Sequence, residues 1–194
     1  MPGCESADAF EHQWYVVHVP TGKEAYMASL IERMSPDGLV YECFTPRYAT
    51  QVKRAGEWVN VEKVLLPGYV FVVTDNPEDL VRTLRVFPEF ARLLTMGESF
   101  VPLTVEDRAW IEAFTHEGER CIAMSEGVLE GDRVVVLRGP LKGNEAIIVS
   151  LNRHKSVAFV ELDFCGRRVK TKVGLGIVSR SEGKPTSRGE RSGH

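Results

Sequence analysis

Residue types that carry catalysis or bind metals are scattered along this 194-residue chain. A metal site needs at least two ligands at short helical or hairpin spacing, and the four cysteines and five histidines are too far apart for that pattern. Cys43 and His18 could be imagined as a nucleophile and its base, but both lie in strand-like sequence where packing explains them. The sequence has no nucleophile elbow, phosphate loop or dinucleotide motif. We therefore expect no enzymatic activity, no metal and no cofactor.

Positive charge is concentrated toward the C-terminal end. Residues 1–127 hold 11 Lys or Arg against 20 Asp or Glu, whereas residues 128–178 hold 9 against 5. A basic module joined to an acidic one suits a polyanion such as RNA, which Arg binds by paired hydrogen bonds and Lys by its point charge. The alternative is a solvated face whose lysines only discourage aggregation at strand edges. The candidate RNA-binding residues are Lys142, Arg153, His154, Lys155, Arg167, Arg168, Lys170 and Lys172.

Composition narrows the cellular setting. A hydrophobic fraction of 43% with 26% charged residues is ordinary for a soluble protein, and no apolar stretch approaches the roughly 18 residues of a membrane span. The N-terminus lacks a basic run ahead of an apolar core, so it does not resemble an export signal. We expect a cytoplasmic protein without membrane contact, whose cysteines are reduced.

Strand and helix patterns alternate in the N-terminal half. Short aromatic and β-branched runs predict strands at 14–19, 41–52, 58–64, 69–73 and 90–95. Helix-start patterns predict three helices. The first begins with a capping box at Thr21 to Glu24, the second with Asn76-Pro77 and the third with Thr104. This order is typical of an α+β, ferredoxin-like (split βαβ) sheet with helices on one face.

The C-terminal part has a different pattern. Residues 117–127 lose the periodicity and predict a linker between a domain at 13–116 and a second domain at 128–178. Four short apolar runs, rich in Val and Ile, predict a small β-barrel rather than helices. Residues 179–194 lack apolar anchors, and we expect this tail and residues 1–12 to be disordered.

Two sets of motifs resemble a known family. Gly131-Asp132-Arg133-Val134, followed by Gly139-Pro140-Leu141-Lys142-Gly143, resembles the KOW motif of ribosomal proteins and transcription elongation factors. Leu65-Leu66-Pro67-Gly68-Tyr69-Val70-Phe71-Val72, with Trp14-Tyr15-Val16-Val17 upstream, resembles the NusG N-terminal domain. Both sets occur in the family's order and spacing, so residues 13–178 are similar to the NusG family. Thr21 to Glu24, Lys53 to Gly56, Arg92 to Leu94 and Pro140 to Gly143 resemble a specialised paralogue of the LoaP type.

The resemblance implies a bacterial, monomeric transcription elongation and antitermination factor. It implies that the N-terminal domain binds the clamp helices of RNA polymerase through an apolar hollow, although Phe71 could equally be plain core. The matching positions for that hollow are Tyr15, Leu66, Tyr69, Phe71, Phe90 and Leu93.

The resemblance also implies an SH3-like KOW barrel that binds RNA, such as a leader hairpin. The hairpin carrying Arg47, Lys53 and Arg54 either contacts non-template DNA or is merely solvated. Two alternatives stay open: a housekeeping NusG whose barrel contacts ribosomal protein or termination factor, and a ribosome-associated KOW protein that binds RNA.

Overall fold

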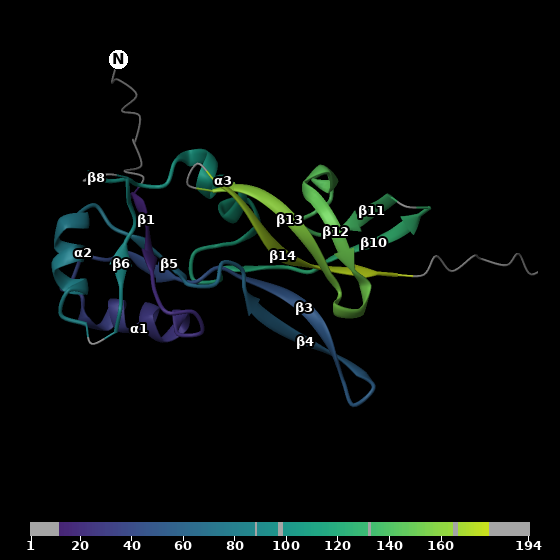
Figure 1. The fold of residues 1–194 in the computed structure, drawn as a ribbon, viewed down its shortest axis with the longest axis horizontal. Coiled ribbons are helices and arrows are strands. Elements are labelled where there is room, and N and C mark those ends of the chain that lie inside the picture. The colour runs from purple at the N-terminus through teal and green to yellow at the C-terminus, as the bar shows by residue number, and fades with distance from the viewer. Residues whose placement is uncertain (1–11, 88, 97–98, 132, 165–166, 179–194) are drawn as a thin grey trace, which may run out of the picture.

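The computed structural model describes residues 12–87, 89–96, 99–131, 133–164 and 167–178. A helix-covered sheet forms one half of the molecule and a barrel forms the other, with α3 between them and the β3–β4 hairpin extending below (Figure 1). Residues 1–11 and 179–194, where the sequence predicts disorder, lie outside the described residues.

The N-terminal sheet contains four antiparallel strands in the order β2-β5-β1-β6. Alternation along β1 directs Tyr15 and Val17 to one face and Trp14 and Val16 to the other. Helices α1 and α2 pack on the face that carries Tyr15 and Val17 (Figure 1). The elements are β1 (Trp14–His18), α1 (Glu24–Met34), β2 (Glu42–Phe44), β5 (Tyr69–Val73), α2 (Pro77–Leu84) and β6 (Arg92–Leu93), followed by a small hairpin of β7 (Thr95–Met96) and β8 (Ser99–Phe100).

The start of α1 differs from the predicted capping box. Lys23, not Thr21, is the N-cap residue, and no side chain caps the helix. The Glu24 carboxylate instead accepts hydrogen bonds from the backbone N–H groups of Gly22, at 2.9 Å, and Gly68, at 2.7 Å. Glu24 is buried and fixes the turn before β5, so sequence spacing identified an acidic anchor but assigned it the wrong partner.

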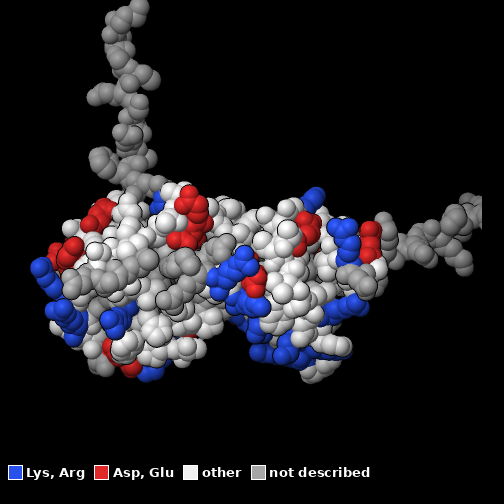
Figure 2. All heavy atoms as spheres, turned by 45° about the horizontal axis from the view of Figure 1, so that its top comes forward, with Lys and Arg blue, Asp and Glu red and all other residues white. Residues whose placement is uncertain are grey.

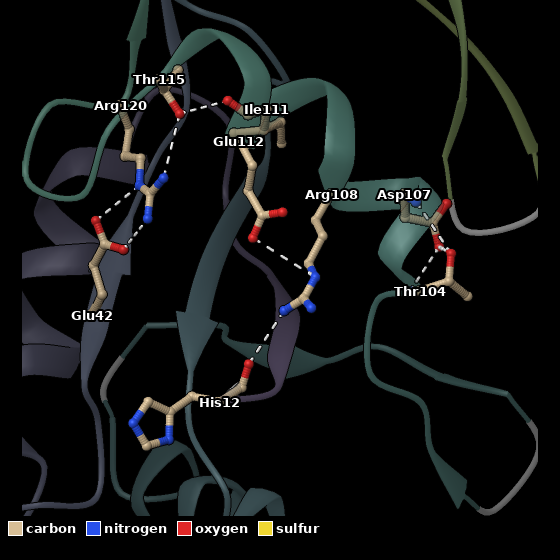
Figure 3. A network of polar contacts seen from close by, with 9 residues as sticks. All are labelled: His12, Glu42, Thr104, Asp107, Arg108, Ile111, Glu112, Thr115 and Arg120. Carbon is tan, nitrogen blue, oxygen red and sulfur yellow. Dashed lines mark hydrogen bonds and ion pairs between the residues drawn. The ribbon is translucent and has the colours of Figure 1, made fainter. Parts of the chain in front are cut away.

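Helix α3 (Val105–Phe114) covers the opposite face of the sheet, and it begins after Thr104 as predicted, with a capping box at its start. Figure 3 shows Thr104 and Asp107 closing that box, and Arg120 paired with Glu42 of β2. The Arg120 guanidinium lies 5.0 Å from the Trp14 ring and 4.6 Å from the Phe44 ring. These contacts anchor the chain after α3 to the sheet, so this face is closed by protein.

A long hairpin leaves the sheet and carries the first contact with the C-terminal half. Strands β3 (Arg47–Arg54) and β4 (Glu57–Val64) pair antiparallel along their whole length. Ala55 and Gly56 both have positive φ, which is the backbone that a two-residue hairpin turn requires. In the segment predicted as a linker, β9 (Cys121–Ile122) pairs parallel with β3.

The C-terminal strands form a five-stranded sheet in the order β11-β10-β14-β13-β12, and the predicted fold class is confirmed. Strands β10 and β14 pair in parallel, and the other pairs are antiparallel. The elements are β10 (Ser125–Glu130), β11 (Arg133–Arg138), the 3₁₀ turn η1 (Glu145–Ile147), β12 (Ile148–Asn152), the 3₁₀ turn η2 (Arg153–Lys155), β13 (Val157–Phe164) and β14 (Arg167–Ile177).

The barrel is docked on the N-terminal domain. The Thr50 hydroxyl donates to the Ser156 carbonyl at 2.9 Å, and the Thr171 hydroxyl donates to the Leu65 carbonyl. A Cβ atom added at Gly174 would lie 1.9 Å from the Ala49 carbonyl oxygen, so β14 and β3 approach more closely here than any side chain permits. One apolar cluster runs through both halves.

Candidate binding surfaces

Three aromatic rings gather where β1 ends and β5 begins. The His18 ring lies 5.5 Å from Tyr69 and 5.8 Å from Phe90, measured between ring centroids. Phe90 is 56% exposed although it is fully apolar, and His18 is exposed beside it. Two predicted polymerase-binding residues, the partly buried Tyr69 and the exposed Phe90, therefore flank His18. The strand pattern alone did not indicate that His18 belongs to this cluster.

The Glu24 anchor positions this cluster. Its carboxylate holds the Gly68 backbone, and Gly68 directly precedes Tyr69. Burial raises the pKa of Glu24, but the N–H donors of Gly68 and Gly22 outweigh burial and hold that pKa below its ordinary value. The ionised carboxylate is therefore the form that stabilises the turn.

Leu66 lies under the barrel rather than on an open surface. It is 5% exposed and lines, with Leu65 and Trp110, a narrow cleft of about 220 Å³ closed on the other side by Leu162 and Val169 of the barrel. In this arrangement of the two halves, a partner reaches Leu66 only after the barrel moves away.

The remaining predicted residues of the hollow lie in the core. Phe71 is fully buried and stacks on Phe44 with the ring centroids 5.4 Å apart. Tyr15 and Leu93 are 6% and 3% exposed and pack on the helix side of the sheet. The six residues predicted to form one hollow thus lie in three settings: an aromatic cluster, the cleft under the barrel and the core. Sequence alone does not assign the face of the sheet to which a strand aromatic points.

The predicted RNA-binding residues are mostly exposed on the barrel. On β14, Lys170 and Lys172 point outward while Thr171 between them is buried, as their alternation predicts. The Lys170 ammonium lies 3.2 Å from Glu161, and the Lys172 ammonium lies 5.4 Å from the centre of the Phe159 ring. The side chains of Lys142, Arg153, His154, Lys155 and Arg168 are exposed as well, whereas the side chain of Arg167 is outside the described set.

Figure 2 shows Lys and Arg side chains gathered low on the right-hand half of the molecule, which holds both the barrel and the β3–β4 hairpin, whereas both signs are mixed over the left-hand half. Among the described residues, Arg153, His154 and Lys155 in η2 have no carboxylate within ion-pair distance. These three residues are therefore available to an anionic ligand.

The hairpin places its three predicted DNA-contact residues differently. Lys53 and Arg54 are exposed next to the turn at the tip. Arg47 lies at the base and is 2.6 Å from the Glu62 carboxylate, so its charge is already paired. Trp58, directly across from Lys53, is 48% exposed, and this exposed aromatic was not among the predicted site residues.

The side chains that could ligate a metal lie apart in the described part of the chain. No cluster of three or more His, Cys, Asp or Glu side chains with metal-binding geometry occurs there. Burial raises the pKa of the Cys43 thiol well above its ordinary value, with Glu32 and Glu42 adding to the effect. Within the same residues, every helix is too short or too polar to cross a membrane.

Residues 12–113 match the protein family described as transcription termination factor nusG, and residues 130–163 match the KOW motif. The first match covers more than half of the chain. The chain belongs to the NusG family. The family assignment agrees with the fold, in which a helix-covered sheet precedes a small barrel that carries the KOW segment.

Curated relatives and a solved structure agree with this assignment. The chain is 24% identical over 181 residues to the transcription termination/antitermination protein NusG of Thermus thermophilus, with 87% of this chain and 98% of the relative covered. It is 24% identical over 179 residues to NusG of Rickettsia prowazekii, with 88% and 91% covered. A structure described as domain interaction in Thermotoga maritima NusG is 20% identical, covers 87% of this chain and 95% of its own, and has a TM-score of 0.54. It supports the fold of this NusG-family transcription factor.

Proposed function

We propose that this NusG-family chain binds RNA polymerase through its N-terminal domain and RNA through its barrel, and so promotes processive read-through of terminators. Its role is binding rather than catalysis. The specialised, LoaP-type antitermination role is part of this proposal, and the clamp helices are the proposed contact on the polymerase.

The exposed cluster of His18, Tyr69 and Phe90 carries the proposal. A phenylalanine that is 56% exposed adds nothing to the core, and two further rings extend its surface. Exposed aromatic anchors of this kind supply most of the affinity where a helical partner packs against an apolar face. Leu66 would enlarge the same surface once the barrel is displaced.

The barrel supplies the second contact. Arg153, His154 and Lys155 form an exposed basic turn, and Lys170 and Lys172 extend the positive charge along β14. Phosphate contacts of this type give affinity without sequence preference and weaken with salt. A factor held to polymerase by one half is then able to engage emerging RNA with the other.

A binding measurement on the full chain tests the proposal. Phe90→Ser should weaken binding to core RNA polymerase by about 30-fold, because loss of an aromatic anchor typically removes about 2 kcal/mol. Val149→Ser is the matched control, since Val149 is 52% exposed but lies on β12 of the barrel. Equal binding by wild type and Phe90→Ser would remove the proposed polymerase contact.

A transcription assay tests the finer role. On a template with a terminator, purified protein should increase read-through, and Arg153→Ala with Lys155→Ala should reduce that increase while polymerase binding is kept. Cosedimentation with ribosomes that depends on the barrel, without any effect on read-through, would instead favour the ribosome-associated alternative.

A further inference from the structure

An unoccupied space lies between the two halves of the molecule. A cleft of about 590 Å³ separates the β3–β4 hairpin from the barrel, which is within the range of roughly 300–1,000 Å³ for ligand-binding clefts. Trp58 and Asn60 line it from the hairpin, and Arg153, Glu126 and Gly176 line it from the barrel. Because its walls come from both domains, neither domain forms this cleft alone.

The hairpin wall presents an aromatic plane and two amides. Trp58 lies opposite Lys53, and Asn60 lies opposite Gln51, so all four side chains are on one face of the hairpin. The Gln51 amide nitrogen donates to the Asn60 amide oxygen at 3.0 Å. Within the described residues, the Gln51 oxygen and the Asn60 nitrogen have no further partner, which leaves an acceptor and a donor beside the indole ring.

The charges of the cleft favour an anionic ligand. Its two acidic residues are already paired, Glu62 with Arg47 at 2.6 Å and Glu126 with Arg138 at 2.7 Å. Arg153, in contrast, has no acidic partner among the described residues. Lys53 is paired with Trp58 across the hairpin, and Lys155 lies two residues from Arg153 in η2. Both are exposed and add positive charge near the lining residues.

We propose that this cleft binds a short segment of single-stranded nucleic acid, with one base stacked on Trp58. The Gln51 and Asn60 amides then hydrogen-bond the edge of a base, and Arg153 contacts a phosphate. An aromatic plane beside a positively charged groove is the arrangement by which proteins hold unpaired strands, because every base has a face that stacks. The inference deepens the proposed RNA-binding function. It rests on that function only for the class of ligand, which is nucleic acid, and it requires no polymerase contact.

Binding of oligonucleotides to the full chain tests the cleft. The probes are oligo(U) and oligo(dT) of about ten nucleotides, which fit the site sizes of single-strand binding modules. Trp58→Ala should weaken binding of the preferred probe by roughly 5- to 150-fold, whereas Trp58→Phe, which keeps an aromatic plane, should retain most of the affinity. Where Trp58→Ala weakens binding, preference for oligo(U) identifies RNA as the ligand, preference for oligo(dT) identifies DNA, and equal affinity means that binding does not depend on the sugar. Each of these three results, together with that loss, supports the cleft.

Tryptophan fluorescence gives a second readout. The chain has three tryptophans, of which Trp14 is 5% exposed and Trp110 is half-buried, so a base that stacks in the cleft should quench chiefly Trp58. The matched control is Val59→Ala, because Val59 is the next residue of β4 and points to the opposite face. The quenching should be lost in Trp58→Phe and kept in Val59→Ala.

Several results would overturn the cleft. They are failure of both probes to bind, equal loss of affinity in Trp58→Ala and Val59→Ala, or unchanged affinity in Trp58→Ala. Lys170→Ala with Lys172→Ala separates this inference from the broader function: weakened RNA binding in that variant with no effect of Trp58→Ala keeps the barrel face and rejects the cleft. Unchanged RNA binding in the double lysine variant, with weakened binding in Trp58→Ala, keeps the cleft and removes the β14 face from the proposed function.

Discussion

Replacing Gly174 by alanine should separate the barrel from the N-terminal domain. The added Cβ would lie 1.9 Å from the Ala49 carbonyl oxygen and 3.0 Å from the carbonyl carbon, both of them backbone atoms that no rotamer change can move. Ordinary contact begins near 3.4 Å, so β14 and β3 must move apart by the difference, about 1.5 Å.

That displacement breaks the polar contacts that join the two halves. The hydrogen bond from Thr50 to the Ser156 carbonyl, now 2.9 Å, would exceed hydrogen-bond length, and the bond from Thr171 to the Leu65 carbonyl is strained in the same way. Each neutral hydrogen bond contributes about 1 kcal/mol, so the docked state loses about 2 kcal/mol before any loss of apolar contact. The equilibrium between docked and open forms then shifts by about 30-fold toward the open form.

Opening should be visible in both shape and affinity. Small-angle scattering should show a larger radius of gyration, and apparent affinity for RNA polymerase should rise by up to about 30-fold because Leu66 becomes accessible. Gly176→Ala is the matched control, since its Cβ would meet only the flexible end of Met124, at 2.8 Å. Expansion without a gain in affinity would refute the role of Leu66, and an unchanged shape would refute the close contact of β3 and β14 as the basis of docking.

Three further predictions concern the anchor, the basic turn and the buried thiol. Because the folded-state pKa of Glu24 lies below its ordinary value of 4.5, its carboxylate stabilises the fold above that pH, and this stabilisation is lost as pH falls through the folded-state pKa. Glu24→Gln should therefore reduce the free energy of unfolding by about 1.5–3 kcal/mol near neutral pH, and by progressively less as the pH is lowered below 4.5, measured by urea denaturation. A loss that stays the same across this acid range would contradict the ionised anchor. Arg153→Ala with Lys155→Ala should reduce the slope of log affinity for single-stranded RNA against log salt concentration by about 0.7 per residue, measured by fluorescence anisotropy; an unchanged slope would exclude these phosphate contacts. Cys43 should be alkylated only at the rate of unfolding, followed by mass spectrometry, and rapid labelling of the native protein would contradict its burial.

Sequence reasoning predicted the elements whose patterns are local. The strand at Trp14 and the helix start at Thr104 depend on near neighbours in the chain, and the structure confirms both of them. The family followed from two motifs in order, and the match to residues 12–113 confirms it.

The site depended on long-range contacts that no local pattern contains. Phe71 and Phe90 are both aromatic residues in strand-like sequence, yet the first is fully buried and the second is 56% exposed, because α3 closes the Phe71 side of the sheet. Leu66 is covered by a barrel that begins some 60 residues later in the chain. Trp58 gains its proposed role only because docking brings Arg153 across from the hairpin.

Hydrogen–deuterium exchange of the full chain, with and without core RNA polymerase, tests the central claim most directly. The account predicts that polymerase slows exchange at residues 17–19, 67–70 and 89–93, which surround His18, Tyr69 and Phe90, while the outer strands β11 and β12 of the barrel keep their free rates. Protection confined to the barrel, or no protection in a complex that demonstrably forms, would contradict a polymerase contact through the N-terminal domain.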